Sequence, residues 1–318
     1  MKLKGCLSHL PESFKVLLTF TFFLTMMMFS AMIAAFVCHL IYGVDFFSTQ
    51  LSAKDYTNAG IINAAKLFQL ISATGAFIVT PLVVAFLFSH HPGKFTGLNV
   101  KPVWLTLLPA FALMFMATPF INYLVKVNSL MSLPDFLHSV ETWMKASEEE
   151  ASKITEMFLK ADNPADLLIN IVVIALVPAI GEELMFRGVI QTLLKKLFGN
   201  IHVAIFLSAF FFSAMHMQFY GFIPRLVLGM VLGFLFEWSG SLWLPVLAHF
   251  VNNASAVLFF YFAQFNEMPF NQDTIGAEQG DFVILIVSIL ISWLLLFFIK
   301  KWSEPYNDAA DNLSGGID

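Results

Sequence analysis

The sequence predicts an all-α fold: a polytopic transmembrane helix bundle of about eight spans, with an extramembrane amphipathic helical insert between spans three and four. Of the 318 residues, 58% are hydrophobic and 12% are charged, which is about half the charged fraction of a soluble domain. The mean hydropathy is +0.77. Long apolar runs recur along the chain, and they favour membrane helices over the short alternating strands of a membrane barrel.

Eight apolar runs predict membrane-spanning helices, with ends defined to within several residues. The first run follows three lysines and is too long for the hydrophobic region of a signal peptide, so we expect a retained helix. The predicted spans are Val16–Tyr42, Leu67–Phe88, Val103–Val125, Leu167–Leu194, Val203–Met217, Phe222–Trp238, Leu242–Phe262 and Phe282–Ile299.

Basic residues predict the orientation. If eight spans alternate, four basic clusters fall on one side of the membrane, whereas the acidic segment 135–166 and the loop 266–281 fall on the other. Positively charged loops favour the cytoplasm, so we expect both termini to be cytoplasmic. The short chain without an organelle-targeting tail favours a bacterial cytoplasmic membrane. The clusters are Lys2, Lys4 and Lys15; His90, His91, Lys94 and Lys101; Lys195 and Lys196; and Lys300 and Lys301.

The fourth predicted span carries two adjacent carboxylates and an arginine inside an apolar run. Ionisable groups within a membrane span are costly and are candidates for function. Glu183 and Arg187 stand at i,i+4 and can pair, whereas Glu182 lies about 100° further round the helix. The arginine can therefore hold one acid while the other stays available for chemistry. Pro178 and Gly181 predict a kink just before the two acids.

Three further polar side chains lie within predicted spans. His216 comes late in span five, and His249 and Asn253 share one face of span seven. From the cytoplasmic ends of their helices, Glu182 and His216 lie about 20 Å inward, His249 about 11 Å and Asn253 about 17 Å. These depths permit one polar site formed by spans four, five and seven. The hypothesis requires Glu182 to lie within about 10 Å of a histidine.

These residue types suit hydrolysis of an amide. A carboxylate in an apolar pocket can act as a general base, and an imidazole can share the proton and orient a water molecule. A second imidazole and a carboxamide can donate hydrogen bonds to the oxyanion that forms when water adds to the carbonyl. No Ser, Cys or Thr stands in an evident nucleophile motif, so direct attack by water is favoured over an acyl-enzyme.

Three motifs in order resemble the three-part motif of the CPBP intramembrane proteases, which comprise the CAAX prenyl endopeptidases and bacterial bacteriocin-processing or self-immunity proteins. The resemblance covers about a third of the chain, from Leu167 to Phe262. It implies that Glu182 and His216 activate the hydrolytic water, that His249 and Asn253 form the oxyanion hole, and that Glu183 and Arg187 support the site. The motifs are Glu182-Glu183-x-x-x-Arg187, Phe212-x-x-x-His216 and His249-x-x-x-Asn253.

We therefore expect an intramembrane endopeptidase that hydrolyses a peptide bond of a membrane-associated or lipidated peptide or protein, in a cavity reachable from the cytoplasm. The alternative is a non-enzymatic membrane protein, either an immunity factor for a peptide toxin or an ion-coupled carrier. Expected partners are membrane lipid and a peptide or protein substrate. Nucleic acid is not expected, because the chain has no suitable basic stripe.

Metal dependence is a separate question. Glu182, His216 and His249 could bind zinc and leave one position open for water, as in a metalloprotease. The H-E-x-x-H pair of the zincins is absent, however, and Asn253 would be a poor zinc ligand. We therefore favour a metal-free glutamate mechanism without a cofactor, and zinc remains the alternative.

The predicted organisation has five parts. Residues 1–126 form three N-terminal membrane helices, and residues 127–164 form the acidic insert, whose apolar residues at helical spacing predict one or two amphipathic helices on the non-cytoplasmic face. Residues 165–262 form the catalytic membrane core of CPBP type. Residues 263–302 hold a loop and the last span, and 303–318 form a disordered tail. Arg225 and Glu237 lie near predicted interfaces, and we assign them no function.

Overall fold

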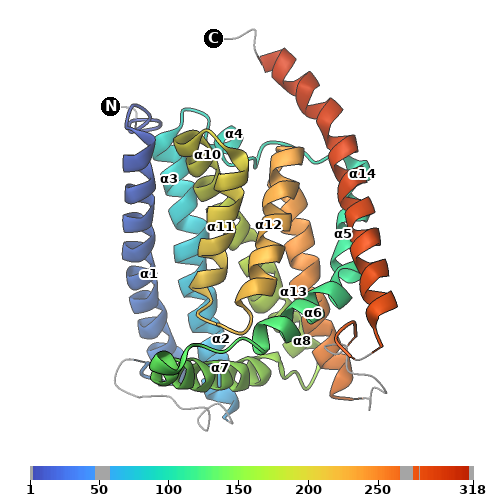
Figure 1. Ribbon diagram of the computed structural model, residues 1–318. Helices are drawn as coiled ribbons and strands as arrows, with labels where there is room; N and C mark the ends of the chain where they lie inside the picture. Colours follow the sequence, from blue (N-terminus) through green and yellow to red (C-terminus); the bar gives the residue numbers. More distant parts are fainter. Residues whose placement is uncertain (1–2, 47–57, 266–274, 279, 315–318) are drawn as a thin grey trace.

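The computed structural model describes residues 3–46, 58–265, 275–278 and 280–314, with side chains up to Ser303. Every regular element in this part of the chain is helical, which confirms the all-α prediction. The long helices run side by side, and α1 begins and α14 ends at the same end of the bundle (Figure 1). We call this end the termini end. The helix α7 (His138–Leu159) lies across the opposite end, which we call the α7 end.

Two N-terminal spans precede the first break in the fold. Helix α1 (Glu12–Tyr42) ends at Gly43, whose φ of 69° is a left-handed conformation that suits glycine. Helix α2 (Ala59–Ala73), a π-helical turn η2 (Thr74–Val79) and α3 (Thr80–Phe88) form one continuous span. This span begins eight residues before the predicted Leu67, because the Asn58 side chain accepts the Gly60 N–H at 2.8 Å and caps the helix.

The third predicted span is broken. Helices α5 (Trp104–Met116) and α6 (Thr118–Ser129) are bent by 42° relative to each other. Pro119 lies in the first turn of α6, where it has no N–H to continue the hydrogen-bond ladder of α5. The bend turns α6 towards the insert. A short α4 (Pro92–Phe95) precedes α5 at the termini end.

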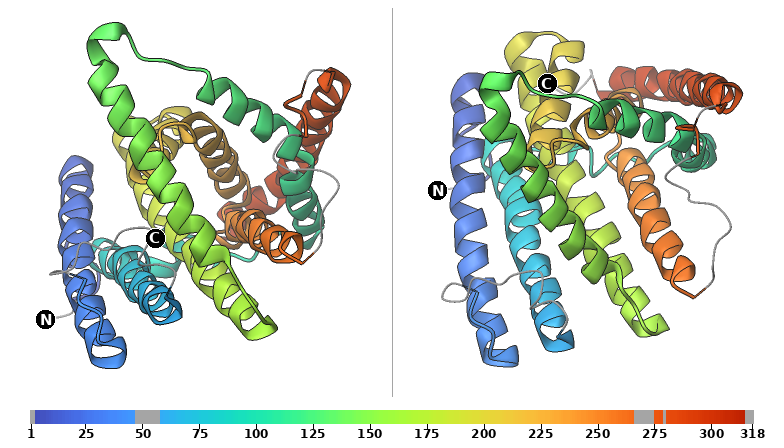
Figure 2. Two further views of the ribbon diagram at one scale, coloured as in Figure 1. Left: turned by 90° about the horizontal axis from the view of Figure 1, so that it is seen from below. Right: turned by 60° about the horizontal axis from the view of Figure 1, so that its bottom comes forward.

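The insert forms a short 3₁₀ turn, η3 (Asp135–Leu137), followed by the single helix α7. Viewed from the α7 end, α7 runs diagonally across the bundle (Figure 2). It is anchored on the loop 216–221, because the Trp143 and Phe219 rings lie 5.6 Å apart and the Tyr220 N–H donates to Glu148 Oε2 at 2.9 Å. The insert therefore covers one end of the bundle.

The segment from residue 164 to 198 is one continuous apolar helix of 35 residues. The expected kink at Pro178 is replaced by π-helical turns on either side of α9, which accommodate the proline without breaking the helix. Gly199 ends this helix with a φ of 63°. The successive elements are α8 (Pro164–Asn170), η4 (Ile171–Leu176), α9 (Val177–Glu183), η5 (Leu184–Gln191) and α10 (Thr192–Phe198).

Four helices complete the bundle: α11 (Ile201–Met215), α12 (Phe222–Ser239), α13 (Trp243–Ala263) and α14 (Phe282–Ser314). In the described part of the chain, six helices are long and apolar enough to cross a membrane, and the bent pair raises this to seven. Helix α11 has 15 residues, about 22 Å, and is shorter than the hydrocarbon core of about 30 Å. All eight predicted segments are thus helical, but eight full spans are not established.

The predicted disordered tail is corrected in part. Helix α14 continues to Ser314 instead of ending near Ile299, and Ala309 and Ala310 favour this continuation. Gly315 follows directly after the helix. Residues 315–318 and most of the predicted loop 266–281 lie outside the described residues.

Candidate active site

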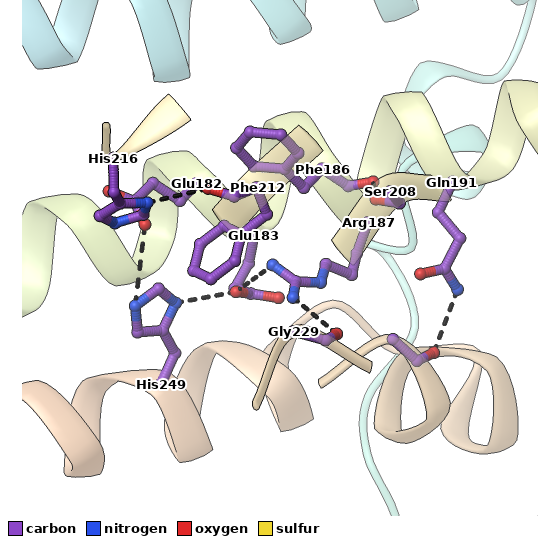
Figure 3. Close-up of polar contacts among 11 residues, drawn as sticks. Glu182, Glu183, Phe186, Arg187, Gln191, Ser208, Phe212, His216, Gly229 and His249 are labelled. Carbon is purple, nitrogen blue, oxygen red and sulfur yellow. Dashed lines mark hydrogen bonds and ion pairs between the residues drawn. The ribbon is translucent and has the colours of Figure 1, made fainter. Parts of the chain in front are cut away.

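The two carboxylates at the end of α9 lie in different environments. The Glu183 side chain is fully buried, whereas 17% of the Glu182 side chain is exposed. Their backbones are both helical, so the difference arises from the angle of about 100° between consecutive helical residues. Glu183 faces Arg187 and His249 of α13, which it contacts, and Glu182 points towards His216 (Figure 3).

Arg187 neutralises the buried acid. Its Nη1 lies 2.7 Å from Glu183 Oε1, and its Nη2 donates to the Gly229 carbonyl of α12 at 2.9 Å. The Arg187 side chain is 1% exposed, and its guanidinium lies 4.8 Å from the centre of the Phe212 ring. A buried charge is tolerated when it is paired and hydrogen-bonded, and this cluster meets both conditions.

His249 links the two carboxylates. Its Nδ1 lies 2.8 Å from Glu183 Oε1 and its Nε2 lies 3.8 Å from Glu182 Oε2. The short contact fixes Nδ1–H as the donor to Glu183, so Nε2 faces Glu182. The distance of 3.8 Å is longer than a direct hydrogen bond, and it is well within the 10 Å that the hydrolase hypothesis requires.

His216 stands at the end of α11, and its ring lies beside the Glu182 carboxylate (Figure 3). Its Nδ1 lies 2.8 Å from the Phe212 carbonyl, so Nδ1–H donates to the backbone and Nε2 remains available to the site. The side chain is exposed, and Glu182, Arg225 and His249 all lie within electrostatic range of it. Three predicted site residues from three helices therefore meet in one place.

Asn253 lies one helical turn after His249 on α13. Its Nδ2 donates to the Ile174 carbonyl of η4 at 3.4 Å, and its Oδ1 accepts from Asn252 at 3.2 Å. Among the described contacts, its hydrogen bonds run to these two residues and not to the histidines. The long bond to Ile174 is weak, so the carboxamide can exchange it for another acceptor.

Phe212 packs at the centre of the site. Its ring lies edge-on to His216 at 5.0 Å, to His249 at 5.8 Å and to Phe186 at 5.4 Å. The ring is buried, and it separates His216 from the Glu183–Arg187 pair. Phe212 thus keeps the exposed and the buried parts of the site apart.

A polar ladder that the sequence reasoning missed extends the site towards the termini end. Gln191 donates to the Gly233 carbonyl at 3.0 Å, and Lys195 pairs with Glu237 at 2.6 Å. Together with Arg187 and Gly229, these contacts repeat every four residues on both helices. The only available signal was the i,i+4 spacing of Gln191 from Arg187 in an apolar run. The ladder sets the register between the helix that carries both glutamates and α12.

Arg225 was also missed. It lies in the first turn of α12 and within electrostatic range of Glu182 and Glu148. Its guanidinium donates to the carbonyl and the side chain of Gln218 in the loop 216–221. The sequence could not indicate these contacts, because the loop 216–221 meets α12 only in the folded structure.

No arrangement suited to a metal ion is present among the described residues: no group of three or more His, Cys, Asp or Glu side chains could hold one. The zinc alternative required Glu182, His216 and His249 together. His216 Nδ1 and His249 Nδ1 are engaged by the Phe212 carbonyl and Glu183, which leaves only Nε2 of each ring to face the space between the helices. Metal dependence therefore stays a question for experiment.

Comparisons with known proteins bear on the same segment. Residues 164–255 match the family model described as Type II CAAX prenyl endopeptidase Rce1-like, and this range contains all six predicted site residues. The chain is also 32% identical to the uncharacterized protein YpbD of Bacillus subtilis (strain 168) over 89 residues, which are 27% of this chain and 42% of that protein. The aligned region thus spans less than half of that relative. No solved structure matches the chain.

Proposed function

We propose that this chain, whose residues 164–255 form an Rce1-like segment, is an intramembrane endopeptidase of the CAAX type. Its substrate is a membrane-associated or lipidated peptide or protein. The observation that carries the proposal is the position of Glu182, which is partly exposed and lies 3.8 Å from His249 beside a fully buried Glu183–Arg187 pair. Because Arg187 already neutralises Glu183, the Glu182 carboxylate can take up and release a proton.

In the proposed mechanism, a water molecule lies between Glu182 and the substrate carbonyl, and His216 Nε2 helps to orient it. The water oxygen forms a bond to the carbonyl carbon while its proton passes to the Glu182 carboxylate. The carbon–nitrogen bond then breaks, and the leaving nitrogen takes this proton. The products are a free carboxylate and a free amine, so Glu182 returns to its charged form.

The oxyanion that forms in this step needs hydrogen-bond donors. His249 can donate from Nε2 when both ring nitrogens carry a proton, since Nδ1–H is already engaged by Glu183. Asn253 can add a second donor after it releases the Ile174 carbonyl. The Glu183–Arg187 pair then acts through His249, because Glu183 Oε1 holds the ring orientation.

The orientation in the membrane is part of the proposal. We propose that both termini lie in the cytoplasm of a bacterial cell. Lysines are more numerous in the segments at the termini end than in those at the α7 end, and positively charged segments favour the cytoplasm. Lys94 lies in α4 and Lys195 and Lys196 lie in α10, and both helices stand at the termini end (Figure 1). Lys300 and Lys301 lie in α14, which ends there.

The main experiment compares membrane peptides from cells that carry the wild-type protein with peptides from cells that carry Glu182→Ala. We expect specific fragments to disappear and their precursors to accumulate in the variant. The purified Glu182→Ala and His216→Ala proteins should each lose cleavage of such a precursor while they elute as folded monodisperse protein. Glu237→Gln, which alters an ion pair far along the ladder, is the matched control and should keep activity.

Two further outcomes would redirect the assignment. Unchanged cleavage by either purified active-site variant would remove the hydrolase proposal. Protection of cells against a peptide toxin by Glu182→Gln would indicate binding without hydrolysis, which is the immunity alternative. Incubation of the purified enzyme with a chelator, followed by addition of zinc, tests the metal alternative directly.

A further inference from the structure

The chain between α11 and α12 carries His216 into the candidate site. This loop, residues 216–221, starts with His216 itself and turns sharply at Met217, whose φ of 52° is uncommon for a residue other than glycine. A backbone conformation of this kind persists only where surrounding contacts hold it in place. The position of the His216 ring therefore depends on the groups that hold the loop 216–221.

Asn128 of α6 holds the loop where it turns into α12. Its Nδ2 donates to the Phe219 carbonyl at 3.0 Å, and its Oδ1 accepts the Ile223 N–H at 2.7 Å. Asn128 is buried, and loss of either bond would leave a polar group without its partner, which is costly away from water. One carboxamide thus joins the loop 216–221 to the first turn of α12.

Glu148 of α7 holds the next residue of the loop. Its Oε2 accepts the Tyr220 N–H at 2.9 Å, and the Trp143 ring, also on α7, lies 5.6 Å from the Phe219 ring. A hydrogen bond to a carboxylate is stronger than one between neutral groups. The adjacent Glu149 is exposed, because consecutive helical residues lie about 100° apart. The two acids therefore differ: Glu148 contacts the loop, and Glu149 lies on the exposed face of α7.

Arg225 of α12 holds a third residue of the loop. Its Nη1 donates to the Gln218 carbonyl at 3.3 Å, and its Nη2 donates to the Gln218 side chain. Glu148 lies within electrostatic range of this guanidinium, so the carboxylate that accepts the Tyr220 N–H also attracts Arg225. The consecutive residues 218, 219 and 220 are thus held by three different helices, α12, α6 and α7.

We infer that Asn128 and Glu148 are positioning residues for the proposed hydrolysis: they fix the loop 216–221 and thereby keep the His216 ring beside the Glu182 carboxylate (Figure 3). This inference rests on the proposed function. Both residues precede the segment 164–255 that matches the Rce1-like family, so α6 and the acidic insert complete a site whose reacting groups lie within that segment. A displacement of a reacting group by about 1 Å can lower a rate about 10²-fold.

Three variants of α7 test the role of Glu148. Glu148→Ala removes the acceptor of the Tyr220 N–H, whereas Glu148→Gln keeps an oxygen that can accept it. We expect Glu148→Ala to lower kcat for a purified precursor peptide at least tenfold while KM and the unfolding temperature stay near the wild-type values, and Glu148→Gln to restore most of this rate. Glu149→Ala is the matched control on the exposed face of α7 and should behave as the wild type. A wild-type kcat in Glu148→Ala, or a change confined to KM, would overturn the inference.

Asn128→Ala tests the contact from α6, and it should lower kcat in the same way. Ser129→Ala is its matched control, because the Ser129 hydroxyl donates to the Lys126 carbonyl within α6. If Asn128→Ala does not fold, Asn128→Asp takes its place: this variant keeps an acceptor for the Ile223 N–H and loses the donor to the Phe219 carbonyl. A folded Asn128 variant with the wild-type kcat would overturn the role of Asn128.

A spin label on the loop reports its mobility without any substrate. The label is attached to Met217→Cys, at a position that is 59% exposed, in a background of Cys6→Ser and Cys38→Ser. Its electron paramagnetic resonance spectrum should show restricted motion in this background and in Glu149→Ala, and faster motion in Glu148→Ala. An unchanged spectrum in Glu148→Ala would overturn the inference.

The kinetic and the spectroscopic readouts separate this inference from the proposed function. A more mobile loop combined with wild-type cleavage in Glu148→Ala would overturn the positioning role while the hydrolase proposal stands. If the wild-type protein cleaves no precursor, the proposed function fails, and the roles of Asn128 and Glu148 in this reaction fail with it, even if the spectra show that α7 holds the loop.

Discussion

Glu183 Oε1 lies 2.8 Å from His249 Nδ1, and the two side chains are almost completely buried. The same oxygen accepts a hydrogen bond from Arg187 at 2.7 Å. One carboxylate therefore holds a cation on its own helix and an imidazole on α13. Glu183 thus neutralises Arg187 and also fixes the orientation of the His249 ring.

Glu183→Gln should reduce both stability and activity. The substitution leaves Arg187 buried without an opposite charge, and loss of one partner of a buried pair costs about 3–5 kcal/mol. Thermal unfolding of the detergent-purified protein measures the first effect and peptide cleavage the second. The double variant Glu183→Gln with Arg187→Met should regain much of the stability but none of the activity. A Glu183→Gln protein with wild-type cleavage would contradict the role assigned to the pair.

Asn253→Ala should lower kcat by about 10²–10³-fold if its carboxamide stabilises the oxyanion. Asn252→Ala is the matched control, because it removes the neighbouring carboxamide and one hydrogen bond to Asn253 but faces another part of the bundle. We expect it to stay within severalfold of the wild type. Equal losses in both variants would indicate that Asn253 supports packing and does not contact the reacting carbonyl.

Gly233→Ala should destabilise the ladder. A Cβ at this position would lie 2.8 Å from Gln191 Oε1 and 2.9 Å from Ile205 Cγ2. Crowding of this kind in a packed interior costs about 1–3 kcal/mol. The double variant with Gln191→Ala should recover part of that loss, since one of the two close contacts is removed. Unfolding curves of the two single variants and the double variant give the coupling, and strict additivity would count against the ladder.

Arg225→Gln should lower kcat about tenfold or more through movement of the loop that carries His216, since small displacements of a reacting group have large effects on rate. Gly221→Ala provides an independent approach, because its Cβ would lie 2.6 Å from Arg225 Nη2 and would push the guanidinium away from Gln218. Both variants should behave alike, and Arg225→Lys should restore part of the rate. A variant that changes only the unfolding temperature would assign Arg225 a purely structural role.

The attachment of α7 should depend on pH only in acid. The Lys145 ammonium and then the Leu133 N–H donate to the Glu141 carboxylate and lower its pKa below the ordinary value of 4.5. Because the folded pKa is the lower one, this stabilisation is present above pH 4.5 and is lost as the pH falls through the folded pKa. Hydrogen exchange of residues 138–159 should therefore be constant from pH 5 to 8 after correction for intrinsic rates. In Glu141→Gln the part of the acid-dependent opening that comes from this carboxylate should disappear, whereas the part that comes from Glu148, which accepts the Tyr220 N–H, should remain.

The local contacts of the site could be predicted from the sequence. Glu183 and Arg187 pair as their i,i+4 spacing requires, and Glu182 points elsewhere because a helix turns about 100° per residue. The eight apolar segments are likewise helical, since the backbone of an apolar run in a membrane must satisfy its own hydrogen bonds. These features depend on neighbours within one or two helical turns.

Contacts between helices were decided by the tertiary structure. The sequence paired no acid with His249, and it gave no signal for the attachment of α7 to the loop 216–221. Such contacts depend on how helices separated by 30 to 70 residues tilt, bend and pack, and hydrophobic periodicity carries little information about this. In this protein the sequence determined which groups are ionisable and where each lies along its helix. Packing between the helices decided which of them come into contact.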